Sequence, residues 1–316
     1  MKKLAFLLLA MLLVLSMTAC DMVEDTTSTL SAIVEETEQE QNTEETNKME
    51  DSTEAITEET EEEHSAVGAE SIAEQVVYDK DGIVITVTGL EKDIWSSKIK
   101  MQLQNDSAKN VTVQVLDFTV NDLVVDPLFS CDVAAGKKAN DTVEIYASEL
   151  DINGIQVIMD IEFRFNIFDT DTWDTVDDTV TVKLETSEAG KTEQVYDDSG
   201  AVVYEGNGIK MVAKTLEVEG SWLGSELYMY IENESDKNIM ITIENTSVNG
   251  YMVDPFFYSE IPAGKKAYDS ITFTDTDLEE NGITSIESFE GVFTISDAES
   301  WNVIATTDVV SLSFTE

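Results

Sequence analysis

The chain has 316 residues and a formal net charge of −47, with 65 acidic against 18 basic residues. This length is too great for one small domain and suits two of ordinary size. A chain this acidic is repelled by phosphate backbones, which excludes nucleic acid as a partner. The single histidine, His64, and the single arginine, Arg164, remove most general-base, triad and zinc-site chemistry. We therefore expect no catalytic residues and a protein that is not an enzyme.

Residues 1–19 have the layout of a secretory signal peptide. A positive start precedes the apolar run 4–15, which is too short to span a bilayer comfortably as a helix. Residues 16–20 (SMTAC) resemble the lipobox of bacterial lipoproteins, although Met17 stands where leucine is usual. The resemblance implies that a diacylglycerol is attached to Cys20, so that acyl chains hold the protein on the extracytoplasmic face of the cell membrane. An ordinary secretory signal with an incidental cysteine is the alternative.

Residues 20–75 are predicted to be the lipidated cysteine and a disordered acidic tether. From Asp21 to Gln75 there are 19 acidic residues against one lysine, in a context of Thr, Ser, Gln and Asn. A flexible coil of this length spans about 40 Å on average, and charge repulsion extends it further. We interpret it as a spacer between membrane and folded domains rather than as a specific acidic binding tail.

The rest of the chain contains an internal sequence duplication. Five matching motifs recur at one constant offset: 105–110 with 233–238, 125–129 with 253–257, 135–139 with 263–267, 153–155 with 281–283, and 165–169 with 293–297. The four tryptophans pair as well, Trp95 with Trp222 and Trp173 with Trp301. Because the period far exceeds that of a solenoid, whole domains are predicted in tandem. We place the first repeat at 76–186, a linker at 187–200 and the second repeat at 201–316.

Within each repeat the apolar residues alternate with polar ones, which is typical of half-buried strands. Asn249-Gly250 predicts a type I′ hairpin, with Asn121-Asp122 as its weaker counterpart. Residues 277–283 predict one helical turn closed by a left-handed glycine, with Ile283 as its apolar contact. About seven strands per repeat favour two tandem immunoglobulin-like β-sandwiches, an all-β fold without the usual cysteine pair.

The repeat also resembles the uncharacterised immunoglobulin-like domains of lipoproteins from clostridia and related Firmicutes. The shared features are the Asn-x-Ser-x-Lys-Asn stretch, the Asn-Gly-type hairpin, Ala-Gly-Lys-Lys and a late Asp-x-x-x-Trp. These are turn and core signatures that cover both repeats but not the tether. The resemblance therefore implies a fold and no ligand.

The densest acidic loop of the folded part is a candidate calcium site. Hard cations take six to eight oxygens, and this loop could supply several from Asp169, Asp171, Asp174, Asp177 and Asp178. Its spacing is not that of an EF-hand, however, and the second repeat carries fewer acids. A solvated turn beside a packed tryptophan is the interpretation we favour.

The second repeat is richer in aromatic residues and offers a candidate surface for a sugar or protein. Its members would be Tyr228, Tyr230, Tyr251, Phe256, Phe257 and Tyr258. Such side chains bury much area at little entropic cost. The alternative is β-propensity or packing between the two domains.

Two smaller features are interpreted structurally. The repeated Gly-Lys-Lys lacks P-loop spacing and is predicted to be a turn with solvated lysines. Cys131, matched by Ser259, is predicted to be a buried inert thiol.

The leading hypothesis is a non-catalytic lipoprotein that binds an unknown extracellular protein or glycan, or acts as a spacer. A calcium-dependent adhesion module that uses the Asp169–Asp178 loop is the second. An enzyme of unfamiliar type, built on paired carboxylates, is the third.

Overall fold

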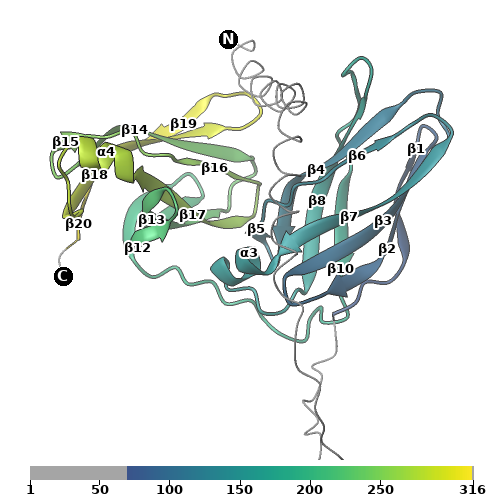
Figure 1. The fold of residues 1–316 in the computed structure, drawn as a ribbon, viewed down its shortest axis with the longest axis horizontal. Helices are drawn as coiled ribbons and strands as arrows, with labels where there is room; N and C mark the ends of the chain where they lie inside the picture. Colours follow the sequence, from purple (N-terminus) through teal and green to yellow (C-terminus); the bar gives the residue numbers. More distant parts are fainter. Residues whose placement is uncertain (1–69, 315–316) are drawn as a thin grey trace, which may run out of the picture. The chain divides into compact units, whose positions relative to one another are not determined.

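The computed structural model describes residues 70–314, which form an almost entirely β structure within one compact unit of the chain (Figure 1). The expectation of an all-β sandwich is confirmed. The leader, Cys20 and most of the tether lie outside the described residues. No helix within residues 70–314 is long and apolar enough to cross a membrane.

The first repeat is built from two facing layers of strands. One layer has the order β1-β2-β3-β7, with bounds β1 (Gln75–Lys80), β2 (Ile83–Lys92), β3 (Ser96–Asn105) and β7 (Lys137–Tyr146). The other contains β4 (Val111–Val120), β5 (Leu123–Val124), β6 (Ser130–Val133), β8 (Asp160–Asp169), β9 (Thr175–Asp177) and β10 (Thr181–Glu185). Alternate side chains from both layers close one apolar interior, in which Ile85, Ile99 and Phe163 are fully buried.

The second repeat follows the same plan. Its first layer runs β17-β13-β12-β11, with bounds β11 (Ala201–Gly206), β12 (Ile209–Ser221), β13 (Gly224–Asn233) and β17 (Lys266–Thr274). Its second contains β14 (Ile239–Val248), β15 (Tyr251–Met252), β16 (Tyr258–Ile261), β18 (Ser288–Asp297), β19 (Val303–Thr306) and β20 (Val310–Ser313). A second apolar interior forms around Met229, Ile241 and Ile295, so each repeat surrounds an interior of its own.

The turns have the backbone conformations that their residues predict. Asn249 and Gly250 lie at φ 51° and 81°, and Asn121 and Asp122 at φ 50° and 63°, as a type I′ hairpin requires. The predicted helical turn is α4 (Asp275–Glu280). Gly282, two residues after its end, lies at φ 68°, and the Ile283 N–H donates to the carbonyl of Leu278 at 2.8 Å.

The first repeat contains the same device, α3 (Ala147–Ile152). Gly154 lies at φ 64°, and the Ile155 N–H donates to the carbonyl of Leu150 at 2.8 Å. Left-handed glycine closure of a short helix is therefore a feature of both repeats.

One sheet runs through both repeats, in the order β10-β8-β4-β5-β17-β13-β12-β11. Its link is a short parallel pairing of β5 with β17 at Leu123 and Lys266. Beside it, the Lys265 ammonium lies 2.7 Å from the carboxylate of Asp122 and 3.2 Å from that of Glu162. Lys265 is only 8% exposed, so the expectation of solvated lysines is wrong at this position. Burial is tolerated because the first repeat supplies two carboxylates.

Candidate ligand-binding surface

The acidic loop begins at Asp169, the last residue of β8, whose side chain is buried. Its Oδ1 accepts the backbone N–H groups of Asp171 (3.0 Å) and Thr172 (3.3 Å), which closes the turn. Its Oδ2 lies 3.1 Å from the ammonium of Lys109. The contact with Lys109 holds the pKa of Asp169 below its usual value, and the two backbone bonds lower it further. This carboxylate is committed to the structure of its own loop.

Asp177, at the end of β9, is similarly committed. Its Oδ2 accepts hydrogen bonds from the Lys80 ammonium (2.8 Å) and the Tyr78 hydroxyl (3.1 Å), both on β1. Its Oδ1 accepts from the backbone N–H (3.0 Å) and the hydroxyl (2.7 Å) of Thr179. Chiefly through Lys80, these contacts hold the pKa of Asp177 well below its usual range. Burial and the bond to Asp177 raise the pKa of Tyr78. Asp177 thus ties one layer of the sandwich to the other.

The three remaining aspartates of the loop have separate partners or none. Asp171 accepts from the side chain of Asn110 at 3.1 Å, and Asp174 from the hydroxyl of Thr172 at 2.9 Å. For Asp178 it is the backbone carbonyl that is engaged, by Arg164 at 2.9 Å. Within residues 70–314, no group of three or more His, Cys, Asp or Glu side chains is placed to hold a metal ion. The five predicted calcium ligands therefore do not form such a group.

The same turn recurs in the second repeat, with Asp297 in the place of Asp169. Asp297 Oδ1 accepts the backbone N–H groups of Glu299 (3.1 Å) and Ser300 (2.9 Å), and Oδ2 lies 2.8 Å from the Lys237 ammonium. Lys237 holds the pKa of Asp297 below its usual range. The Trp301 N–H donates to the carbonyl of Asp297 at 2.9 Å, as that of Trp173 does to Asp169 at 2.8 Å.

The repeated Asn-x-Ser-x-Lys stretch supplies the lysine that pairs with the aspartate of this turn. The Asn105 amide donates to the carbonyls of Lys109 (2.7 Å) and Val133 (2.8 Å) and accepts the Ser107 N–H (3.0 Å). Asn233 makes the corresponding bonds in the second repeat, to Lys237 (2.8 Å), Ile261 (3.0 Å) and Ser235 (3.1 Å). The stretch thereby fixes the lysine that faces the loop aspartate. It is a structural device rather than a ligand motif.

Each turn presents a tryptophan to solvent. Trp173 is 67% exposed and Trp301 is 65% exposed, and both lie in the left-handed backbone region at φ 63° and 62°. One face of Trp173 stacks on Phe168 at 5.3 Å, but its indole is not enclosed. The expected packing of this tryptophan is therefore limited to the one face that contacts Phe168. The aspartate–lysine pair and the backbone bonds turn each indole outward from the sandwich.

The other tryptophan pair is also exposed, Trp95 by 74% and Trp222 by 90%. Trp95 lies in the β2–β3 connection beside Ile94, and Trp222 in the β12–β13 connection. In the sequence, Trp95 and Trp222 indicate the duplication. Because both tryptophans recur in loops that connect strands, their positions in the sequence could have indicated a role at the surface.

The six aromatic residues proposed as a surface have different environments. Tyr251, Phe256 and Tyr258 are more than half exposed. Phe257, in contrast, packs edge-on against Phe293 at 5.8 Å, next to the interior of the second repeat.

The two tyrosines of β13 are not free surface residues. Tyr230 is only 1% exposed because the ring of Tyr268 lies on it at 5.3 Å, so it cannot belong to the proposed surface. Tyr228 is half-buried and donates to Glu226 at 3.0 Å. Apolar and polar residues alternate along β13 as the sequence predicts, but Tyr268 covers Tyr230 on the face that points away from the interior.

A cleft of about 670 Å³ lies where β4, β5 and α3 meet β16 and β17. Tyr258 and Arg164 line it, together with Glu149 and Asp269. Desolvation raises the pKa of both carboxyl groups, although each also accepts a backbone N–H, from Asp126 at 2.6 Å and from Ser270 at 2.7 Å. The cleft thus contains carboxyl groups that already have structural partners.

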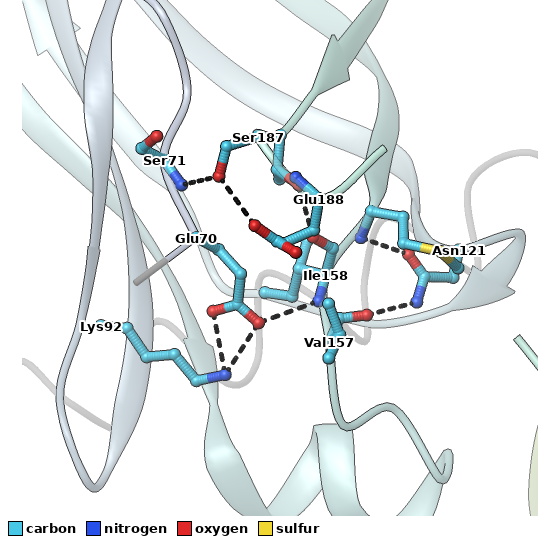
Figure 2. Close-up of polar contacts among 10 residues, drawn as sticks. Glu70, Ser71, Lys92, Asn121, Val157, Ile158, Ser187 and Glu188 are labelled. Carbon is cyan, nitrogen blue, oxygen red and sulfur yellow. Dashed lines mark hydrogen bonds and ion pairs between the residues drawn. The ribbon is translucent and has the colours of Figure 1, made fainter. Parts of the chain in front are cut away.

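The folded part begins with a polar junction (Figure 2). The buried Glu70 carboxylate lies 3.0 Å from the Lys92 ammonium and accepts the Ile158 N–H at 3.2 Å. Ser71 and Ser187 exchange hydrogen bonds, N–H to carbonyl at 2.8 Å and N–H to hydroxyl at 3.3 Å. The point where the chain enters the first repeat therefore adjoins the point where it leaves. Composition predicts that the tether extends to residue 75, whereas Glu70 and Ser71 already contact the first repeat.

No protein-family model matches this chain, and no curated protein is detectably similar to it. The assignment of a role therefore depends on the residues themselves.

Proposed function

We propose that this protein is a lipoprotein held outside the cell membrane through Cys20, whose β-sandwich repeats form a non-catalytic binding module for an extracellular protein or glycan. The leader that ends at Cys20 supports the membrane anchor, since two acyl chains on one residue suffice for stable attachment. The binding role rests on one observation, the repeated ion-paired turn that exposes Trp173 and Trp301.

Exposed tryptophans in such turns suit recognition for two physical reasons. An indole buries a large area on contact and has few rotatable bonds, which makes tryptophan a frequent energetic centre of interfaces. A left-handed conformation costs free energy for any residue with a side chain, and such strain is characteristic of functional sites. Asp171 and Asp174 flank Trp173, and Glu299 lies close to Trp301 in sequence, so the partner surface should be neutral or basic.

The anchor is tested by Cys20→Ala, with Cys131→Ser as the matched control. Cells that produce each variant are separated into membranes and medium. We expect the Cys20→Ala protein in the medium and the Cys131→Ser protein on the membrane. Membrane attachment of Cys20→Ala would refute the lipid anchor.

The binding role is tested on arrays of extracellular glycans and on purified surface proteins. The double variant Trp173→Ala/Trp301→Ala should bind its best target at least about tenfold more weakly than the native chain. The control Trp95→Ala/Trp222→Ala removes the same number of indoles from other loops and should bind normally. The reverse result would place the site at the other loops, and no binding by the native chain would favour a spacer.

One observation supports the enzyme hypothesis: the carboxyl groups of Glu149 and Asp269, which line the cleft, both have a raised pKa. The bond from Ser270 N–H to Asp269 recurs in the first repeat, from Thr142 N–H to Asp141 at 2.8 Å. Asp141 does not line the cleft. This arrangement is therefore a property of the strand in both repeats, which supports a structural role over a catalytic one.

A further inference from the structure

We propose that this protein binds further copies of itself head to tail, by repeating between molecules the contact that β17 and β5 make within one chain. The proposal concerns a different surface from the tryptophan turns and holds whatever those turns bind.

The internal contact has a donor side and an acceptor side. The donor side consists of Lys266, the first residue of β17, and of Lys265 just before it. The ammonium of Lys265 meets Asp122 and Glu162, and the Lys266 N–H donates to the Asp122 carbonyl at 2.9 Å. On the acceptor side, β5 supplies two apolar residues. Leu123 is fully buried in the interior of the first repeat, and Val124 packs against the interior of the second repeat.

The first repeat has an equivalent donor side that is unoccupied. Lys137 and Lys138, which match Lys265 and Lys266, are exposed. Within residues 70–314 neither makes an ion pair, whereas Lys265 pairs with Asp122 and Glu162 of the other repeat and Lys266 with Glu232 of its own. Their strand, β7, is the last of the β1-β2-β3-β7 sheet, so its outer edge keeps unpaired backbone groups.

The second repeat has an equivalent acceptor side that is also open. Tyr251 and Met252 stand where Leu123 and Val124 stand in the first repeat, yet they are 54% and 66% exposed. Glu290 stands in the place of Glu162 and is exposed. In the described part of the chain it accepts a bond from the Ser311 hydroxyl at 3.2 Å and has no lysine or arginine within ion-pair distance.

A second copy of this chain fits both open sides at once. Its β7 lysines would face Glu290, and the edge of β7 would cover Tyr251 and Met252. Because the two sides lie on different repeats, the contact is heterologous, and each added molecule leaves a new side open. Rings or linear chains then form rather than a single symmetric pair.

One residue makes the contact between molecules weaker than the contact within the chain. Gly250 replaces Asp122, so one of the two carboxylates that hold Lys265 has no counterpart. The high acidic charge also opposes assembly at low ionic strength. We therefore expect association at high local concentration rather than in dilute solution.

The first test uses sedimentation velocity on residues 20–316 with Cys20→Ser, at about 0.15 M salt and from about 10 µM to about 1 mM protein. The native surface should give sedimentation coefficients that rise with concentration. Lys137→Glu/Lys138→Glu removes the donor side, and Tyr251→Ser/Glu290→Gln removes the acceptor side. Each variant alone should stay monomeric, and their equimolar mixture should form one-to-one complexes and nothing larger. Lys191→Glu, a single charge reversal in the connecting segment, should assemble like the native chain.

The second test is a gain of function. Gly250→Asp restores the missing carboxylate, and Asp122 shows that aspartate is accommodated at this turn position, at φ 63° beside the 81° of Gly250. No other atom lies within 4 Å of where the new Cβ would be. We expect at least about threefold tighter association. The proposal is overturned if the native chain and Gly250→Asp both remain monomeric, or if the donor-side variant associates as strongly as the native chain.

Discussion

Trp173 and Trp301 share one strained backbone conformation, at φ 63° and 62°, and each follows an aspartate that is paired with a lysine from the neighbouring turn. The two environments differ in one respect. Trp173 stacks on Phe168, whereas Ser296 stands at the corresponding position near Trp301. The conformation is therefore a property of the turn and does not depend on aromatic packing.

Trp301→Gly should stabilise the protein by about 0.5–1 kcal/mol, because glycine adopts positive φ without steric cost. Trp173→Gly should change stability by less than about 0.5 kcal/mol, because the loss of stacking on Phe168 offsets the relief of strain. Urea denaturation measures both. A destabilisation of more than about 1 kcal/mol by Trp301→Gly would mean that this indole is structural rather than retained for binding.

The local sequence predicts the backbone of this protein better than it predicts its surface. Asn249-Gly250 and the glycine after α4 have the expected conformations, because turn geometry depends on a few adjacent residues. The environments of Tyr230 and Lys265 were mispredicted, because each is decided by a residue far away in sequence. Tyr268 covers Tyr230, and Asp122 from the other repeat pairs with Lys265. Alternation along a strand cannot reveal such partners.

In the candidate site, too, local features could be predicted from the sequence and distant contacts could not. The acidic loop was recognisable from its composition, but the partners of its aspartates were not. Lys109 and Lys80 lie in other strands or turns, and they engage Asp169 and Asp177, two of the five aspartates proposed as calcium ligands. Conversely, the exposure of all four tryptophans depends on loop conformation, which composition does not encode.

Calcium should leave the melting temperature unchanged. Asp169 and Asp177 would have to release Lys109 and Lys80 before they could coordinate a cation, which exchanges existing ion pairs for new ones. The check is differential scanning calorimetry with millimolar calcium and then with chelator. A rise reversed by chelator would restore the calcium-dependent adhesion hypothesis.

Cys131 should be unreactive in the folded protein. The side chain is 5% exposed, and burial raises the pKa of its thiol to about 12, with a further contribution from Asp141. In the Cys20→Ser background, a thiol reagent such as DTNB should react at least about a hundredfold faster in urea than in buffer. Cys131→Ser should cost less than about 1 kcal/mol, because Ser259 holds the same position against Asp269. Rapid labelling of the native protein would contradict the buried environment.

Asp177→Asn should destabilise the protein by about 2 kcal/mol at pH 7, because the amide is uncharged and its single oxygen cannot accept from both Lys80 and Thr179 as the two carboxylate oxygens do. The folded-state pKa of Asp177 is lowered, so the carboxylate contributes stability above its unfolded pKa of about 3.9 and loses it as the pH falls through the folded value. The difference between native and variant unfolding free energies should therefore be constant from neutral pH down to about pH 5 and shrink below about pH 4. Urea titrations across this range measure it, with the exposed Asp174→Asn as a control that should differ by less than about 0.5 kcal/mol throughout. A difference that persists unchanged into acid would show that Asp177 acts by packing and not by charge.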